Sequence, residues 1–425
     1  MATALVVGNM IGSGVFLLPA ALAPFGWNSV FGWIFTIAGG LCIAYALSAM
    51  ARAIPKEGGP YAFTRAAFGP GPAFFVAWSY WISIWVGNAA VATGTVSYLT
   101  VFFPVIAKTP GLPALICIGA VWILTAINCR GAFLAGGVQL ITTVLKLAPL
   151  AAVMIIAAIV IFTGSAEVQI APFDPGAIKL PAVTAAATLT LWALLGLECA
   201  TVPAEKVRDA ERTVPRATMF GTALAGVFYL FTCSAVVLLL PADEVANSAA
   251  PFSDFVSRFL DPRAGVVLAV FVAISGFGAL NGWILVQGEL PYAMARDGVF
   301  PSFLAKASAR GTPVRAHIVS STLLTIVVLL NYTKSMTDLF TFVLLLSTTA
   351  SLFMYLVSGL AALALKRRGL AKAPGLTAIA IIATIYSVWT IYGAGAEAVL
   401  WGLVLLAAGA PVYLFVRWQN RVRPA

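Results

Sequence analysis

Long apolar runs separated by short polar connectors recur along the whole chain. An α-helix needs about 20 apolar residues to cross the hydrocarbon core of a bilayer, and most of the runs reach that length. The pattern predicts twelve membrane-spanning helices, at residues 1–24, 27–51, 72–104, 112–128, 134–163, 182–203, 215–240, 262–295, 314–331, 337–365, 374–393 and 397–417. An even number of spans puts both termini on the same side of the membrane.

The composition agrees with this pattern and excludes a soluble domain. The chain is 61% hydrophobic and 9% charged, with a mean hydropathy of +0.99, so we expect an all-α polytopic membrane protein forming a single transmembrane domain over residues 1–425. A cleavable signal peptide is not expected, because the first apolar run begins without a polar flank. The half-helix before Gly12 has only about 11 residues, or roughly 16 Å, so we expect a short cytoplasmic lead to precede it.

The basic residues predict the orientation of the chain. With the N-terminus in the cytoplasm, 19 of the 25 Lys and Arg side chains fall in cytoplasmic segments. Lys146 lies inside a span, and the outer segments hold five: Lys108, Lys179, Arg258, Arg263 and Lys334. Positively charged loops stay on the cytoplasmic side, so both termini are predicted to be cytoplasmic. The same topology explains the net charge of +10, and no nucleic-acid partner is expected.

The first apolar run contains Gly12-Ser13-Gly14 near its middle, where a membrane helix should be most regular. Small residues in a row are poor helix formers. A backbone that leaves the helix within the bilayer must satisfy its N–H and C=O groups in a buried site. We interpret the segment as a helix break that binds a substrate. Close helix packing through the small residues Gly8 and Gly12 is the alternative.

Two halves of the chain share a pattern that supports this interpretation. We predict inverted repeats at 1–163 and 182–365, each of five spans, followed by two further spans at 374–417. Long loops at about 52–71 and 241–261 recur at matching positions on opposite sides of the membrane. Span 6, the counterpart of span 1, carries Gly196 beside Glu198 at mid-depth. Paired interrupted spans in inverted halves indicate the binding site of a transporter.

The sequence lacks the residue patterns of an enzyme or a metal site. The five cysteines are scattered without metal-ligand spacing, and His317 is the only histidine, so a histidine-based catalytic or metal cluster is excluded. There is no Gly-rich nucleotide loop and no paired aspartate motif. We therefore expect no enzymatic activity, no metal and no cofactor.

Several motifs resemble those of the amino acid–polyamine–organocation transporters, and most of all their basic amino acid/polyamine antiporters, such as the arginine/agmatine, lysine/cadaverine and putrescine/ornithine exchangers. The matching segments are Gly8 to Ala20, Gly58 to Ala62, Tyr80-Trp81, Trp85 to Asn88, Leu191 to Glu198, Arg212 to Ala217 and Gly282-Trp283. They occur in order over nearly the whole chain.

The resemblance implies a five-plus-five inverted-repeat fold like that of the leucine transporter, with discontinuous helices 1 and 6 around the substrate. It implies that the substrate carboxylate meets the N–H groups of Ser13 and Gly14, beside Gly12, and the Ser13 hydroxyl. Half-helix N-termini favour such an anion. The α-amino group would meet the carbonyls of Ile11, Trp192 and Leu195. The residues assigned to the gates are Tyr80, Trp192, Glu198 and Trp283.

The wall that would meet the substrate side chain departs from the arginine exchanger. Ser83 and Ile84 replace small or thiol residues, Asn88 is retained, and Val91 replaces a stacking methionine. Leu344-Leu345-Leu346 stands where the exchanger has a serine, although Ser347 and Thr348 follow. These changes weaken the polar contacts available to a guanidinium and favour a more apolar substrate side chain.

Two titratable residues inside the spans are candidates for coupling. Lys146 in span 5 costs at least about 2.5 kcal/mol at mid-membrane and requires acceptors. It resembles the helix-5 lysine of proton-coupled amino acid permeases and large neutral amino acid exchangers, where it takes the place of a sodium ion. Either Lys146 titrates during transport or it ties span 5 to span 1 permanently. Glu198 either binds a cation or proton, or caps freed N–H groups and joins a gate.

We therefore predict a sodium-independent secondary transporter of the bacterial inner membrane. It would move an amino acid or an amino acid/amine pair by alternating access, through exchange or proton coupling. A passive pore and a non-transporting amino acid sensor on the same fold are the alternatives. The sequence leaves open which amino acid or amine is moved, whether transport is antiport or symport, and whether two copies form a homodimer.

Overall fold

The computed structural model describes residues 8, 10–56, 58–131, 137–164, 170–201 and 209–422. Over these residues the chain is built of helices and their connections, with no β-strand. The first half contains η1 (Ser13–Phe16), α2 (Leu18–Leu22), η2 (Ala23–Phe25), α3 (Trp27–Ala53), α4 (Pro60–Phe68), α5 (Pro70–Leu99), α6 (Val105–Lys108), α7 (Leu112–Arg130) and α8 (Gly137–Thr163).

The second half begins with a short 3₁₀ turn and continues as long helices to the end of the described chain. Its elements are η3 (Pro175–Ala177), α9 (Leu180–Trp192), α10 (Ala210–Leu239), α11 (Ala242–Asn247), α12 (Pro251–Phe259), α13 (Pro262–Arg296), η5 (Ser302–Ala305), α14 (Val314–Leu330), α15 (Met336–Arg367), α16 (Leu376–Gly393), α17 (Gly395–Ala407) and α18 (Gly409–Val422).

Within the described residues, nine helical segments are long and apolar enough to cross a membrane. They lie in α3, α5, α7, α8, α10, α13, α15 and α16 and in the continuous stretch Gly395–Arg421. Two shorter apolar helices, Leu180–Trp192 and Val314–Leu330, occupy two further predicted spans. The prediction of an all-helical membrane protein is confirmed, and the count of twelve spans and the inverted repeat stay predictions.

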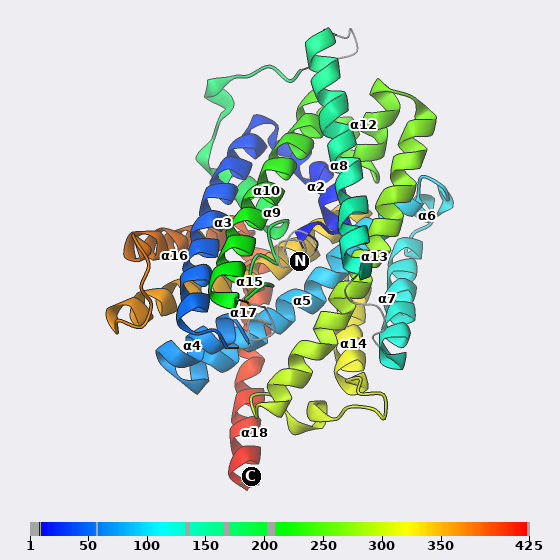
Figure 1. The fold of residues 1–425 in the computed structure, drawn as a ribbon. Helices are drawn as coiled ribbons and strands as arrows, with labels where there is room; N and C mark the ends of the chain where they lie inside the picture. Colours follow the sequence, from blue (N-terminus) through cyan, green and yellow to red (C-terminus); the bar gives the residue numbers. More distant parts are fainter. Residues whose placement is uncertain are drawn as a thin grey trace.

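The long connectors contain helices that the hydropathy pattern did not indicate. The loop predicted at 52–71 holds α4, and the loop predicted at 241–261 holds α11 and α12. These helices are short, and α12 has its apolar residues on one buried face. They lie at the ends of the bundle, with α12 at one end and α4 and α18 at the other (Figure 1).

Helix α5 forms the centre of the bundle and crosses it at a slant (Figure 1). It packs against α15 and α13, while α3 packs against α10 and α9 on one side. Most side chains of α5 are buried, including Tyr80, Ser83 and Asn88. A helix that is surrounded on all sides by other helices can present polar groups to an internal cavity without exposing them to lipid.

Large apolar side chains cover much of the outer surface. Phe162 is 89% exposed, Leu330 74% and Phe220 62%. Exposed apolar side chains in such numbers would be unfavourable in water. A hydrocarbon environment removes that cost, which agrees with an integral membrane protein.

Candidate substrate site

The first apolar segment is interrupted where its glycines lie. Ile11 and Gly12 are outside any helix, and the chain then makes the 3₁₀ turn η1 and the short helix α2. Gly12 has extended dihedral angles, with φ −103° and ψ 173°, and begins η1 without a side-chain cap. The interruption confirms the helix break and leaves main-chain polar groups of this segment inside the bundle.

The second interruption follows α9, which ends at Trp192. Residues 193–201 form successive turns, with hydrogen bonds from Leu195 N to Trp192 O at 3.0 Å and from Cys199 N to Gly196 O at 3.0 Å. Gly196 has a φ of +106°, which residues with a side chain rarely adopt. The glycine therefore allows the chain to leave the helical path inside the apolar segment.

The two interruptions meet through Gly14 and Trp192. A Cβ atom at position 14 would lie 2.0 Å from Cη2 and 2.4 Å from Cζ3 of Trp192. The indole ring also makes an edge contact with Phe340, with the ring centroids 5.6 Å apart. Because the ring occupies the space that a side chain at position 14 would take, the glycine is required for Trp192 to close over the first break.

A narrow cavity lies beside these contacts. Its volume is about 50 Å³, which is smaller than a typical small-molecule site. The described residues that line it are Met10, Gly12, Tyr80, Ser83, Ile84, Gly87, Asn88, Val91, Trp192, Leu195, Glu198, Trp283, Ser347 and Ser351. Most of the residues predicted for substrate binding and gating therefore come together around one cavity.

Glu198 is the only charged side chain among the described residues of this lining. Its Oε2 accepts a hydrogen bond from the Gly196 N–H at 3.2 Å and one from the Tyr355 hydroxyl at 2.6 Å. Tyr80 interacts with the same carboxyl group. The carboxyl group thus bonds an N–H freed by the second break and joins it to α5 and α15. The gating role of Glu198 stays a prediction.

Lys146 does not line the cavity but contacts the first segment behind it. Its ammonium group donates to the Gly8 carbonyl at 3.0 Å, and the side chain is 3% exposed. The contact joins α8 to the first segment four residues before Gly12. It provides the acceptor that a buried lysine requires, and it matches the tie between spans 5 and 1.

Other predicted contacts differ from the structure or lie beyond it. The Trp192 carbonyl, expected to accept from a substrate, already accepts from Leu195 N. The predicted contact between the Ser13 hydroxyl and the substrate carboxylate involves a side chain outside the described part of the chain. The Ser13 backbone forms the start of η1. Neither Ile11 nor Gly14 is among the lining residues.

The wall formed by α15 is more polar than the sequence suggested. Ser347 and Ser351, rather than the leucines at 344–346, line the cavity, and the Ser347 hydroxyl donates to the Ser83 carbonyl at 2.8 Å. With Tyr355, these residues repeat every four positions along one helix face. The four-residue spacing can be read from the sequence. Only the orientation of α15 in the fold shows that this face of the helix points toward the cavity and Glu198.

Comparisons with known proteins identify the family of the chain. The family model described as "Amino acid permease" matches residues 1–414. The putrescine transporter PotE of Haemophilus influenzae is 31% identical over 422 residues, covering 98% of this chain and 96% of that protein. The cadaverine/lysine antiporter of Escherichia coli is 33% identical over 77% of this chain and 73% of its own length. A putative arginine/ornithine antiporter of Bacillus subtilis is 31% identical, with 97% and 95% covered.

Proposed function

This chain belongs to the amino acid permease family, whose members are transporters rather than enzymes, and from that premise we propose that it exchanges one amino acid or amine for another across the bacterial inner membrane. The exchange is sodium-independent and proceeds by alternating access. Its framework has twelve spans, ten of them in a five-plus-five inverted repeat and two after it, with both termini in the cytoplasm. The antiporters among its relatives support exchange over uncoupled uptake.

One observation carries this proposal: two interrupted segments and three long helices line the same cavity. Main-chain groups at the breaks suit the charged groups that every amino acid shares. Glu198, the only charged residue among those described in the lining, favours a cationic substrate. The substrate therefore sits between the breaks, with its carboxylate toward η1 when it has one.

The contacts around Trp192 and Glu198 support transport by alternating access. Trp192 covers the first break on one side of the cavity, while Glu198, Tyr80 and Tyr355 close another. When the Trp192 contact opens and the contacts of Glu198 with Tyr80 and Tyr355 stay closed, the cavity is exposed to one side of the membrane. The reverse exposes it to the other side. Lys146 holds the first segment in the role that sodium fills in related folds.

Counterflow in proteoliposomes tests the proposal. Vesicles loaded with unlabelled putrescine, lysine, ornithine or arginine should take up the matching labelled compound, and replacing sodium with choline should leave the rate unchanged. Empty vesicles serve as the control. Uptake that is equally fast into empty vesicles would identify a passive pore, and ligand binding without flux would identify a sensor. A rate that requires sodium would contradict the role given to Lys146.

A further inference from the structure

A pocket lies where the end of α3 meets the start of α10, two helices that pack side by side (Figure 1). Its volume is about 360 Å³, within the range of small-molecule sites. The described residues that line it are Arg52, Glu211, Arg212 and Arg216, and all four are exposed. In the predicted topology this end of both helices is cytoplasmic. We call Arg52, Arg212 and Arg216 the arginine cluster.

The arginine cluster carries positive charge that the described residues do not neutralise. Three guanidinium groups face one carboxylate in the lining, so positive charge is in excess. None of the three guanidinium groups forms an ion pair or a hydrogen bond with a described residue. By contrast, Arg258 in α12 pairs with Glu244 at 2.7 Å. Like charges around one pocket repel one another, so an anion bound between them would be stabilised.

The side chains that follow Arg216 along α10 show what surrounds the pocket. Phe220 is 62% exposed, Val227 43% and Phe231 57%. At 3.6 residues per turn, positions 216, 220, 227 and 231 lie within about 60° of one another around the helix. Arg216 therefore stands at the end of an apolar stripe that faces the lipid, at the depth where hydrocarbon gives way to headgroups.

Helix α3 repeats this arrangement with Arg52. Ile34 is 48% exposed and precedes Arg52 by five full turns, so the two side chains lie on the same face of the helix. Ala38, Leu41 and Tyr45 lie on that face between them, and each is at least partly exposed. The pocket thus joins the cytoplasmic ends of two neighbouring apolar stripes.

We propose that the arginine cluster binds the headgroup phosphate of an anionic phospholipid of the cytoplasmic leaflet, whose acyl chains lie along the apolar stripes of α3 and α10. Guanidinium groups form paired, charge-assisted hydrogen bonds to phosphate oxygens. Basic pockets between membrane helices at the cytoplasmic surface bind such headgroups. A soluble phosphate would contact only the pocket, whereas a phospholipid contacts the pocket and both stripes. This second site is separate from the substrate cavity and goes beyond the proposed function.

The test uses the purified full chain in detergent and measures its apparent Tm as phosphatidylglycerol or phosphatidylcholine is added to the micelles. A ligand of the folded state raises Tm by mass action. We expect phosphatidylglycerol to stabilise the wild-type protein and zwitterionic phosphatidylcholine to stabilise it far less. Arg212→Gln and Arg216→Gln should each weaken the apparent affinity for phosphatidylglycerol about tenfold, or ~1.4 kcal/mol. Glu211→Gln should strengthen it, because the described lining then has no carboxylate.

Two further variants separate the site from general effects of charge and of the apolar surface. Arg421→Gln is the matched control, because Arg421 is exposed in the last turn of α18 and does not line the pocket. It loses the same charge, and its affinity for phosphatidylglycerol should stay within twofold of wild type. Phe220→Ala shortens the stripe next to Arg216 and should weaken phosphatidylglycerol binding about threefold through lost contact with an acyl chain.

Three results would overturn the inference. Equal stabilisation by phosphatidylglycerol and phosphatidylcholine would show that the pocket does not select an anionic headgroup. Equal affinities for Arg216→Gln and Arg421→Gln would reduce the effect to net charge. Inorganic phosphate that stabilises the protein as much as phosphatidylglycerol at the same concentration would identify a site for a soluble anion. If the arginine variants do not fold, Glu211→Gln decides, because unchanged or weaker phosphatidylglycerol binding would contradict the inference. None of these measurements requires transport, so the proposed function is tested separately.

Discussion

At the scale of single residues, the Trp192 ring occupies the space beside Gly14 that a side chain there would need. A methyl group at position 14 would overlap Cη2 and Cζ3 of the indole, and both residues are buried. Overpacking of a closed site costs about 1–3 kcal/mol. Gly14→Ala should therefore displace Trp192, lower the apparent Tm in detergent and reduce counterflow by more than tenfold.

Gly12→Ala is the steric comparison for this variant. A Cβ at position 12 would meet its nearest atoms at 3.9 Å and 4.0 Å, which are ordinary contacts. Its extended backbone also suits alanine. We expect a smaller change in Tm than for Gly14→Ala. Equal destabilisation by the two variants would show that the Trp192 contact does not limit position 14.

The hydrogen bond between Tyr355 and Glu198 gives a second prediction. Tyr355→Phe removes a 2.6 Å bond from a carboxyl group that is 2% exposed. The loss of a partner by a buried polar group costs about 1–3 kcal/mol, so the variant should unfold at lower temperature and exchange substrate more slowly. Tyr45→Phe, which removes an exposed bond to the Pro374 carbonyl, should change both quantities far less.

At the scale of elements, Tyr98 joins the connector helix α12 to the first break. Its hydroxyl donates to the Phe16 carbonyl at 2.9 Å and accepts from the Phe252 N–H at 3.3 Å. The Phe16 and Phe252 rings also meet edge to face, with centroids 5.2 Å apart. These contacts connect the first turn of α12 directly to the last residue of η1.

Tyr98→Phe should weaken this connection. Two buried backbone groups would each lose a partner, at about 1–3 kcal/mol apiece before relaxation. Amide hydrogen exchange should rise in η1 and in the first turn of α12. Tyr229→Phe is a matched control, because the Tyr229 hydroxyl is buried without a partner among the described residues, and its removal should be neutral or slightly stabilising. Unchanged exchange in Tyr98→Phe would contradict the connection.

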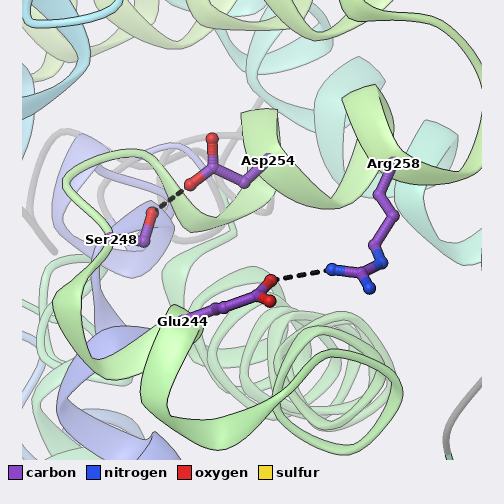
Figure 2. A network of polar contacts seen from close by, with 4 residues as sticks. All are labelled: Glu244, Ser248, Asp254 and Arg258. Carbon is purple, nitrogen blue, oxygen red and sulfur yellow. Dashed lines mark hydrogen bonds and ion pairs between the residues drawn. The ribbon is translucent and has the colours of Figure 1, made fainter.

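The segment from α11 to α12 is held by two polar contacts (Figure 2). Arg258 pairs with Glu244 at 2.7 Å, and the Ser248 hydroxyl donates to the Asp254 carboxylate. Partial burial of the carboxyl group, together with the negative charge of Glu244, raises the pKa of Asp254 above its ordinary value of 3.8, against the effect of the Ser248 bond.

This raised pKa predicts the direction of a pH effect. Because the folded state holds the Asp254 proton more tightly than the unfolded state, stability falls as pH rises from 3.8 through the raised pKa. Asp254→Asn cannot lose a proton and should remove that part of the pH dependence. The measurement is the apparent Tm of both proteins from pH 3.5 to 7. Parallel curves would show that Asp254 does not contribute.

At the scale of the whole molecule, Lys146 links two segments that lie far apart in the sequence. Its bond to the Gly8 carbonyl holds α8 against the first segment. We expect Lys146→Ala to slow counterflow about tenfold or more, because a tenfold change needs only ~1.4 kcal/mol and a buried carbonyl loses its donor. If the ammonium is a fixed tie, the reduction is the same at pH 6 and pH 8. A reduction confined to one pH would identify Lys146 as a proton carrier.

The positions of the helices and of the two breaks were predictable because they depend on local properties. Apolar length marks a span, and glycines within it, such as Gly12 and Gly196, mark where the helix is weakest. The residues missed by the sequence analysis, Tyr355, Gln287 and Tyr98, act through partners on other helices. Nothing in the local pattern of α13 indicates that Gln287 would meet Asn88, 199 residues away.

The sequence by itself determined that the chain is a membrane protein and that its spans contain few polar residues. It also determined which segments cannot remain regular helices. Hydropathy and helix propensity act along the chain, so they can be read from neighbouring residues. Tertiary structure alone decided that Trp192 covers Gly14 and that Ser347 rather than the preceding leucines lines the cavity. It also decided that Gln287 bonds the Asn88 amide. Those facts depend on the rotation and spacing of packed helices, which are set by contacts between distant parts of the chain.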